Sequence, residues 1–211
     1  MTADAAKDWI SVFKQRQIWE LTQNRIEEWI ERNSEFFSLL SDVLPGEARV
    51  LELGCGPGRH AIAQALCGYL VTAIDIDPTI LEQARKNAMN CAPDSHIEFL
   101  IQDMNCLDGF AEDLKLDAVT HGGLMEHFPS PDAIRTSLHR QLAVAPYVIF
   151  DVPFDTRKNR ALFDKDTIFR QIWTSEKWTS EILSGFGVIE WRTEIHEEAS
   201  MTDDLIVCIR R

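Results

Sequence analysis

The chain has 211 residues, of which 45% are hydrophobic and 26% are charged. These values are typical of one ordinary globular domain with a single substantial core. Its 34 acidic residues outnumber its 21 basic residues, so the formal net charge at pH 7 is −13. A surface this acidic disfavours nucleic acids and anionic membranes as partners, because both carry phosphate charge. A small molecule is therefore the expected partner.

The five cysteines include no C-x-x-C pair, and their number is odd. This pattern argues against a disulfide framework or a zinc knuckle and predicts a reducing compartment, the cytoplasm. The first residues carry charge and lack a long apolar run, which argues against a secretory signal. No apolar stretch approaches the roughly 20 residues that span a bilayer. The sequence leaves the oligomeric state open between a monomer and a homodimer.

Residues 1–44 are predicted to form a helical arm. From residue 4 to about 42, apolar residues recur at three- and four-residue steps, as on one face of a helix. Three of them are tryptophans, Trp9, Trp19 and Trp29, which need a surface to pack on. Pro45 and Gly46 end this region with a turn. We expect the arm to cover the functional site as a lid.

Residues 45–211 alternate between strand and helix patterns, and we expect them to form the main domain. Such alternation predicts βαβ units and a mostly parallel sheet with helices on both faces. Residues 188–195 alternate apolar and polar side chains, which favours antiparallel pairing with one wet face. The prediction is an α/β sandwich of three layers with seven strands, the last of them antiparallel. The predicted strands are 49–53, 71–75, 97–101, 117–120, 147–152, 188–195 and 204–209, and the predicted helices are 57–67, 78–90, 131–142 and 175–184.

Residues 153–172 do not fit the alternation, because they are rich in charged and aromatic side chains. They are predicted to form an insert over the carboxyl edge of the sheet, where ligands bind in folds of this kind.

The strongest local motif is Glu-Leu-Gly-Cys-Gly-Pro-Gly-Arg at residues 52–59. It follows a predicted strand and opens a predicted helix, where glycines allow a sharp turn and let a ligand approach the backbone. A dinucleotide site needs a glycine at the position of Arg59. The carboxylate of Glu52 just before the loop instead suits a cationic amino acid.

Residues 49–152, about half the chain, resemble the core of class I, Rossmann-like S-adenosylmethionine-dependent methyltransferases. The glycine motif, Asp75 at the end of the second strand, Asp103-Met104 after the third, and the run after Asp117 all match. The resemblance implies that Asp75 holds the ribose, that Asp103 and Met104 meet the adenine, and that Ile76 packs on it. The cofactor residues that it implies are Glu52, Gly54, Cys55, Gly56, Gly58, Asp75, Ile76, Asp103, Met104 and His121.

Structural roles for three of these acids remain open. Asp75 would then cap the following helix, Asp103 would belong to a turn, and Glu52 would pair with a nearby base.

Methyl transfer depends mainly on aligning acceptor, methyl group and sulfur, and a general base helps if the acceptor is a hydroxyl. His121, Glu126 and His127 follow the fourth predicted strand, at the carboxyl edge, and are the candidate catalytic residues. Alternatively, Glu126 and His127 only hydrogen-bond the backbone of the next segment.

The same run resembles a metal-binding branch of the family, which includes quinone-biosynthesis O-methyltransferases and small-RNA end methyltransferases. That branch carries E-x-x-E-H, whereas this chain has Gly123 at the first position. Because a divalent ion prefers several oxygen ligands, we expect no metal.

The acceptor pocket is predicted to include Trp19 of the arm, Phe154 of the insert and Trp173. Residues 173–178 resemble the segment that precedes the last helix of small-molecule methyltransferases. The predicted function is methyl transfer from S-adenosylmethionine to an oxygen or nitrogen of a small molecule, with S-adenosylhomocysteine as product. Alternatives are a protein or peptide methyltransferase, a non-catalytic S-adenosylmethionine-binding protein, and an NAD-dependent oxidoreductase, which Arg59 disfavours.

Overall fold

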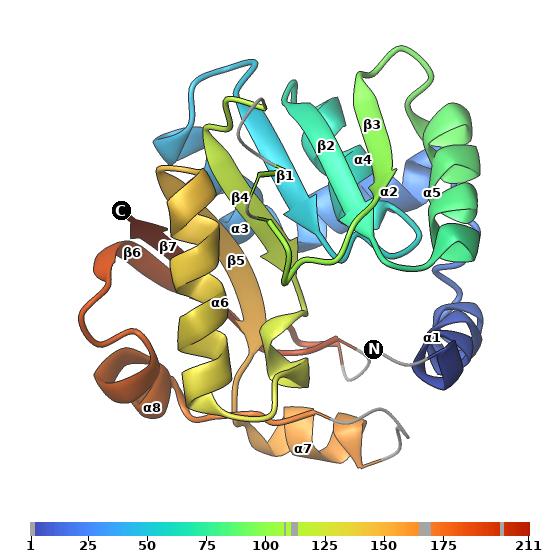
Figure 1. The fold of residues 1–211 in the computed structure, drawn as a ribbon. Helices are drawn as coiled ribbons and strands as arrows, with labels where there is room; N and C mark the ends of the chain where they lie inside the picture. The colour runs from blue at the N-terminus through green and yellow to red at the C-terminus, as the bar shows by residue number, and fades with distance from the viewer. Residues whose placement is uncertain (1–2, 108, 111–113, 165–169, 199–200) are drawn as a thin grey trace.

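The computed structural model describes residues 3–107, 109–110, 114–164, 170–198 and 201–211, with only the backbone for residues 3–8. Within these residues one sheet forms the middle layer, and helices cover both of its faces (Figure 1). The strands run in the order β3-β2-β1-β4-β5-β7-β6. All pairs from β3 to β5 are parallel, whereas β7 runs antiparallel to both β5 and β6. The predicted fold class is confirmed, with strands β1 Arg49–Leu53, β2 Leu70–Asp75, β3 Ile97–Ile101, β4 Ala118–Gly122, β5 Tyr147–Pro153, β6 Gly187–Glu194 and β7 Asp204–Arg210.

Two of the connecting helices begin at side-chain caps that the sequence encodes. The side chain of Asp77 accepts the backbone N–H groups of Thr79 and Ile80, and that of Ser130 accepts the N–H of Ala133. A proline follows each cap and suits the first helical turn. The helices are α1 Ala3–Gln15, α2 Gln23–Arg32, α3 Ser34–Val43, α4 Arg59–Leu66, α5 Pro78–Cys91, α6 Pro131–Val144, α7 Arg157–Phe163 and α8 Ser175–Lys177.

The predicted helix at 175–184 is wrong in form. The three-residue α8 is followed by a π-helical turn, Trp178–Ile182. Within this turn the Trp178 side chain is fully buried against the sheet.

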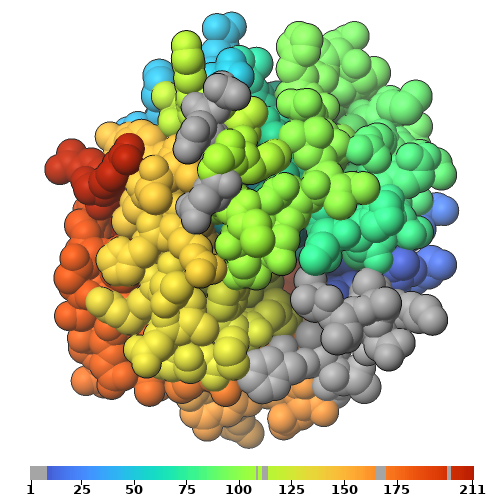
Figure 2. Space-filling model, viewed as in Figure 1, coloured from blue at the N-terminus to red at the C-terminus, as the bar shows by residue number. Residues whose placement is uncertain are grey.

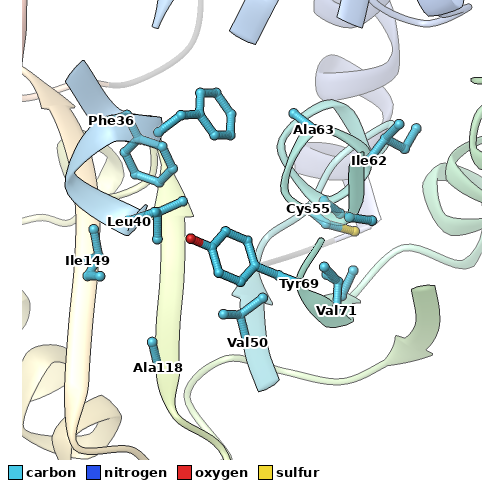
Figure 3. Packing of buried hydrophobic residues seen from close by; sticks show 14 of the residues in the cluster. Phe36, Leu40, Val50, Cys55, Ile62, Ala63, Tyr69, Val71, Ala118 and Ile149 are labelled. Carbon is cyan, nitrogen blue, oxygen red and sulfur yellow. The ribbon is translucent and has the colours of Figure 1, made fainter. Parts of the chain in front are cut away.

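Side chains alternate between the two faces of the sheet and build two cores. Val50 faces the layer of α2 to α5, where Phe36 and Leu40 of α3 pack near Tyr69 (Figure 3). Leu51, the next residue, belongs to the opposite core beneath α6 and the π-helical turn. Because both faces are covered, the free edge at the carboxyl ends of the strands is where a ligand can enter.

The arm consists of α1, α2 and α3, and a buried amide ties it to the domain. Asn87 on α5 donates from Nδ2 to the carbonyl oxygens of Trp19 (2.9 Å) and Pro57 (2.8 Å). Its Oδ1 accepts the backbone N–H of Leu21 at 3.1 Å. One side chain thus joins the segment between α1 and α2 to the glycine loop.

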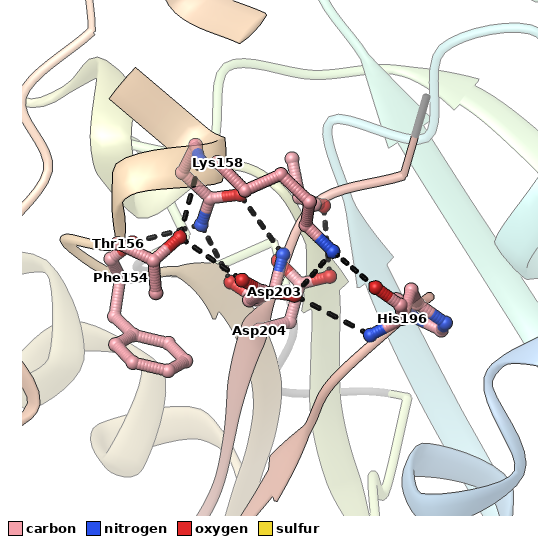
Figure 4. A network of polar contacts seen from close by, with 8 residues as sticks. Phe154, Thr156, Lys158, His196, Asp203 and Asp204 are labelled. Carbon is pink, nitrogen blue, oxygen red and sulfur yellow. Dashed lines mark hydrogen bonds and ion pairs between the residues drawn. The ribbon is translucent and has the colours of Figure 1, made fainter. Parts of the chain in front are cut away.

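The described part of the predicted insert contains α7; residues 165–169 lie outside the described residues. Asp203, just before β7, anchors this helix through several contacts (Figure 4). Its carboxylate forms an ion pair with Lys158 and accepts the hydroxyl of Thr156 at 3.0 Å. Asn159 Nδ2 donates to the carbonyl oxygen of Asp203 at 2.7 Å. The start of α7 is therefore fixed to β7 at the carboxyl edge of the sheet.

On the face of the sheet opposite to α2–α5, α6 contacts the segment after β3. In the space-filling view α6 (yellow) and this segment (green) lie side by side (Figure 2), and Arg140 Nη1 donates to the carbonyl oxygen of Asn105 at 3.4 Å. None of the helices in the described part of the chain is both long and apolar enough to cross a bilayer.

Candidate functional site

A cavity of about 760 Å³ lies at the carboxyl ends of β1, β2 and β4. Strand order reverses between β1 and β4, and open α/β sheets bind ligands at such a switch point. The volume is in the range of small-molecule sites. The residues that line it come from the arm, the glycine loop and the segments after β2, β3 and β4. They include Trp9, Phe13, Glu52, Gly54, Cys55, Gly56, Arg59, His60, Asp75, Ile76, Asp103, Met104, Gly122, Gly123, Leu124 and His127.

The structure brings eight of the ten predicted cofactor residues to this cavity. Gly58 and His121 are the two that do not line it. The eight are Glu52, Gly54, Cys55, Gly56, Asp75, Ile76, Asp103 and Met104.

The glycine loop exposes bare backbone at the cavity wall. Gly54 (φ +60°) and Gly56 (φ +53°) are both left-handed. A Cβ atom at Gly54 would lie 3.1 Å from Cδ1 of Leu124, and one at Gly56 would lie 3.1 Å from Cζ of Phe13. Both the backbone conformation and the close neighbours therefore require glycine.

Gly58 has a packing role instead. A Cβ atom there would lie 3.2 Å from the Cβ of Ala84 on α5, so Gly58 lets α4 start close against α5. Its predicted contact with the cofactor remains a prediction beside this helix contact.

Asp75 ties the glycine loop to the turn after β2. Its Oδ2 accepts the N–H of Gly56 at 3.1 Å, and its Oδ1 accepts the N–H of Asp77 at 3.0 Å. The helix cap considered for Asp75 belongs to Asp77. Burial raises the pKa of Asp75. Each carboxylate oxygen keeps a further lone pair, so Asp75 can still accept two hydroxyl groups from a ligand.

Glu52 is held by neutral neighbours and not by the base considered from the sequence. Its Oε2 accepts Nε2 of Gln64 (2.7 Å) and the hydroxyl of Thr120 (2.6 Å). Burial raises the pKa of Glu52 from 4.5 to about 7, although the two hydrogen bonds oppose the shift. The glycine loop therefore has a carboxyl group at its base that titrates near neutral pH.

The Glu52→Gln substitution should change how stability depends on pH. The folded protein holds a proton that the unfolded chain releases between about pH 4.5 and 7, so the contribution of Glu52 to the free energy of unfolding falls as pH rises through this window. Glutamine does not titrate. The unfolding free energy of the variant minus that of the wild type should increase by about 3 kcal/mol from pH 4.5 to 8, measured by urea denaturation.

The control for this prediction is Glu31→Gln on the exposed surface of α2. It removes the same formal charge without a buried site. A difference between Glu52→Gln and wild type that stays constant across the pH range would contradict the prediction.

Asp103 lines the cavity and also forms a turn. Its Oδ1 accepts the backbone N–H of Asn105 at 2.9 Å and the Nδ2 of the same residue at 3.0 Å. The structural role that the sequence left open is thus present, and it leaves the second carboxylate oxygen for other contacts.

The three predicted catalytic residues occupy different places. His127 lines the cavity, where its ring lies edge-on to Trp9 with centroids 4.8 Å apart. Glu126 is buried just behind it, with Oε1 3.6 Å from Nε2 of His127. His121 is fully buried and stacks on Phe150, with centroids 4.9 Å apart.

His121 is not positioned for catalysis or for cofactor contact. β4 extends to Gly122, so the side chain of His121 points into the core instead of the loop. Burial lowers the pKa of His121 to about 3. We correct both of its predicted roles to core packing.

The predicted acceptor residues Trp19, Phe154 and Trp173 do not line the cavity. Phe154 and Trp173 pack against the core under α6. The Nζ atom of Lys14 lies over the Trp19 ring, 5.5 Å from its centroid. The aromatic wall comes instead from Trp9 and Phe13 on α1, whose rings stack 5.4 Å apart.

Sequence reasoning missed a polar group on the other side of the glycine loop. His60 Nε2 lies 3.6 Å from Oδ2 of Asp151, at the end of β5. Burial lowers the pKa of His60 to about 3, so the ring is neutral. Burial, followed by the charge of Asp204, raises the pKa of Asp151 well above its usual value. His60, Asp151 and Asp204 are far apart in the sequence and come together only in the fold, so no local sequence motif indicates their contact.

Comparison with known proteins agrees with this geometry. Residues 50–144 match the sequence model of a family described as a methyltransferase domain. The chain is 37% identical over 91 residues to the ubiquinone biosynthesis O-methyltransferase of Xanthomonas campestris pv. campestris (strain B100), a match that covers 43% of this chain. It spans 36% of the length of that relative. The putative methyltransferase YqeM of Bacillus subtilis (strain 168) is 26% identical over 170 residues, or 76% of this chain and 68% of YqeM.

Solved structures share the fold. Magnesium protoporphyrin IX methyltransferase from Synechocystis PCC 6803, with bound S-adenosylhomocysteine, aligns over 100% of both chains with a TM-score of 0.72 and 21% identity. The N-methyltransferase NodS from Bradyrhizobium japonicum WM9, in complex with the same compound, aligns over 85% of both chains with a TM-score of 0.63 and 19% identity. Residues 50–144 are thus similar to a methyltransferase domain, and the chain has the class I, Rossmann-like fold of these methyltransferases.

Proposed function

We propose that the chain binds S-adenosylmethionine in the cavity and transfers its methyl group to an oxygen or nitrogen of a small molecule, with S-adenosylhomocysteine as product. The observation that carries this proposal is Asp75, whose carboxylate lines the cavity beside the bare backbone of Gly54 and Gly56. A carboxylate at this point suits the paired hydroxyls of a ribose, because charge-assisted hydrogen bonds are the stronger kind.

The other lining residues fit an adenosyl amino acid. Ile76 and Met104 offer apolar surface for a base, and Asp103 offers a carboxylate beside them. The donor supplies an activated methyl group on a sulfonium with a good leaving group. The chain's own contribution is to hold the acceptor in line and to keep water out, so proximity is the main source of rate.

The arm supports a compact acceptor. Trp9 and Phe13 of α1 cover the cavity beside His127, whereas a polypeptide acceptor calls for a long open groove. We propose that residues 1–44 act as the lid of a main domain formed by residues 45–211. His127, backed by Glu126, is positioned to accept a proton from a hydroxyl or ammonium group at the cavity.

The same proposal includes a reducing, cytoplasmic setting. All five cysteines are free, and Cys55, Cys91 and Cys208 are buried. Free thiols in this number are typical of proteins in a reducing compartment.

Calorimetric titration with S-adenosylhomocysteine and with NAD tests the proposal. Binding of the former and not of NAD is the expected result, and a preference for NAD would overturn it. A screen of phenols, carboxylates and heterocyclic amines, read by formation of S-adenosylhomocysteine, then identifies the acceptor. Binding without turnover on any small molecule or peptide would favour the non-catalytic alternative.

Removal of metal ions should leave methyl transfer unchanged. Within the described ranges no three His, Cys, Asp or Glu side chains are grouped to hold an ion. Gly123 has a φ of +59°, and a Cβ there would lie 3.4 Å from Oε1 of Glu126, so this backbone does not suit the missing carboxylate. Turnover on the acceptor from the screen should be equal before and after treatment with EDTA. Activity that disappears and returns with Mg²⁺ or Zn²⁺ would contradict the prediction.

A further inference from the structure

Arg59, the first residue of α4, places a cation in the wall of the cavity without a counter-ion in contact. Among the described residues, no carboxylate oxygen lies within 4 Å of its guanidinium, and no hydrogen bond from this side chain is found. Its Nε is inaccessible to solvent and has no partner. A guanidinium that is partly removed from water without hydrogen bonds is costly to the protein alone.

The guanidinium stays charged near neutral pH. Burial lowers the pKa of Arg59 to about 10, and the charge of Asp151 opposes this shift. The charges of Arg16 and Arg25 in the arm act in the same direction as burial and also lower this pKa.

Trp29 on α2 fixes the plane of the guanidinium. The Cζ of Arg59 lies over the Trp29 ring, 3.3 Å from its centroid, so the ring covers one side of the guanidinium. A stacked guanidinium suits a planar anion that accepts two parallel N–H groups.

We propose that Arg59 is the carboxylate-recognition residue of the cavity, held in position by Trp29. The inference rests on the proposed function. The carboxylate has two possible sources, the amino-acid end of the adenosyl donor or an acid group on the acceptor. Arg59 follows the glycine loop directly, so both sources lie within the same crevice.

The experiment compares ligands that differ only in this group. S-adenosylhomocysteine and its decarboxylated analogue are titrated calorimetrically into wild type, Arg59→Gln and Arg59→Lys. If the donor supplies the carboxylate, Arg59→Gln weakens the binding of S-adenosylhomocysteine by about 10- to 100-fold. This is the effect expected from the loss of one charged hydrogen-bonding pair. Binding of the decarboxylated analogue stays unchanged, and Arg59→Lys recovers only part of the loss because it lacks the planar fork.

A second arm tests the acceptor as the source. Aromatic carboxylates and their matching amides are titrated into the free protein and into its complex with S-adenosylhomocysteine. If the acceptor supplies the carboxylate, wild type prefers the acids and Arg59→Gln loses this preference, while its affinity for S-adenosylhomocysteine is unchanged. Arg32→Gln is the matched control, because Arg32 is an exposed arginine at the end of α2 that pairs with Glu198.

Equal losses for S-adenosylhomocysteine and its decarboxylated analogue in Arg59→Gln would overturn the inference, as would the absence of any carboxylate preference in both arms. Failure of the proposed function is a separate result: wild type would then bind neither adenosyl ligand, and the carboxylate panel on the free protein would still test Arg59. Near-ultraviolet circular dichroism and Tm establish that each variant is folded before titration.

Discussion

Replacing Asp75 with alanine should weaken the binding of S-adenosylhomocysteine by about 100-fold or more, measured by calorimetry. The substitution removes a charged acceptor for two ribose hydroxyls, and each charged hydrogen bond contributes about 1.5–3 kcal/mol. It also removes the bond from Gly56 N–H to Oδ2, which holds the glycine loop against β2. Ligand contact and loop geometry are lost together.

Two variants separate these effects. Asp75→Asn keeps one side-chain oxygen and should lose less affinity than Asp75→Ala. Asp77→Ala removes the cap of α5 and should lower the free energy of unfolding by about 1 kcal/mol with a much smaller effect on affinity. An unchanged affinity in Asp75→Ala would mean that the ribose is held elsewhere.

The Gly122→Ala substitution should destabilise the protein by about 1–3 kcal/mol, the usual cost of overpacking. A Cβ atom at this position would lie 2.6 Å from Cε1 and Nε2 of His60 and 2.9 Å from Oδ2 of Asp151. The His60 ring is confined by Phe36, 5.2 Å away between centroids, and Asp151 is held by the N–H of Gly123 at 2.9 Å. Neither neighbour can move aside without shifting its element.

The same variant should also bind S-adenosylhomocysteine at least about tenfold more weakly. His60 lies in the first turn of α4, so its displacement moves the end of the glycine loop, and small misplacements in a site are costly. Urea denaturation and calorimetry measure the two effects. Gly46→Ala is the control, since nothing lies within 4 Å of a Cβ there and its φ is not positive. Equal behaviour of the two variants would contradict the prediction.

The features that local sequence patterns encode were predicted correctly. Strand and helix periods differ, so the alternation from residue 49 onward gave the layers and the mostly parallel sheet. The glycine loop and Asp75 were placed at the cavity because backbone conformation and position after a strand decide where they lie. These are properties of short segments, which a single sequence contains.

The errors concern which way a side chain points. His121 and His127 lie six residues apart, and only the extension of β4 to Gly122 decides that the first is in the core. Trp9, Trp19 and Trp29 are alike in an apolar pattern, yet only Trp9 lines the cavity. Such choices depend on packing between elements far apart in the sequence.

The residues that were missed are paired across the fold. Arg59 stands one position after the glycine loop, but its stacking on Trp29 of the arm requires α2 to cross α4. Asp151 gains its neighbours because β5 lies beside β4 and β7. Gly122 offered a weak signal, since a glycine without a turn suggests close approach of other groups.

The hydrogen bonds of the Asn87 side chain bear on how the protein unfolds. Asn87 is 1% exposed, and its side-chain amide bonds both the backbone of Trp19 and Leu21 and the carbonyl oxygen of Pro57. Detaching the arm would leave buried donors and acceptors without partners in both the arm and the main domain, which costs free energy. We therefore expect the arm and the sheet to unfold together in a single transition. A chain that lacks residues 1–44 is then expected to be less stable and to bind ligand more weakly than the whole chain.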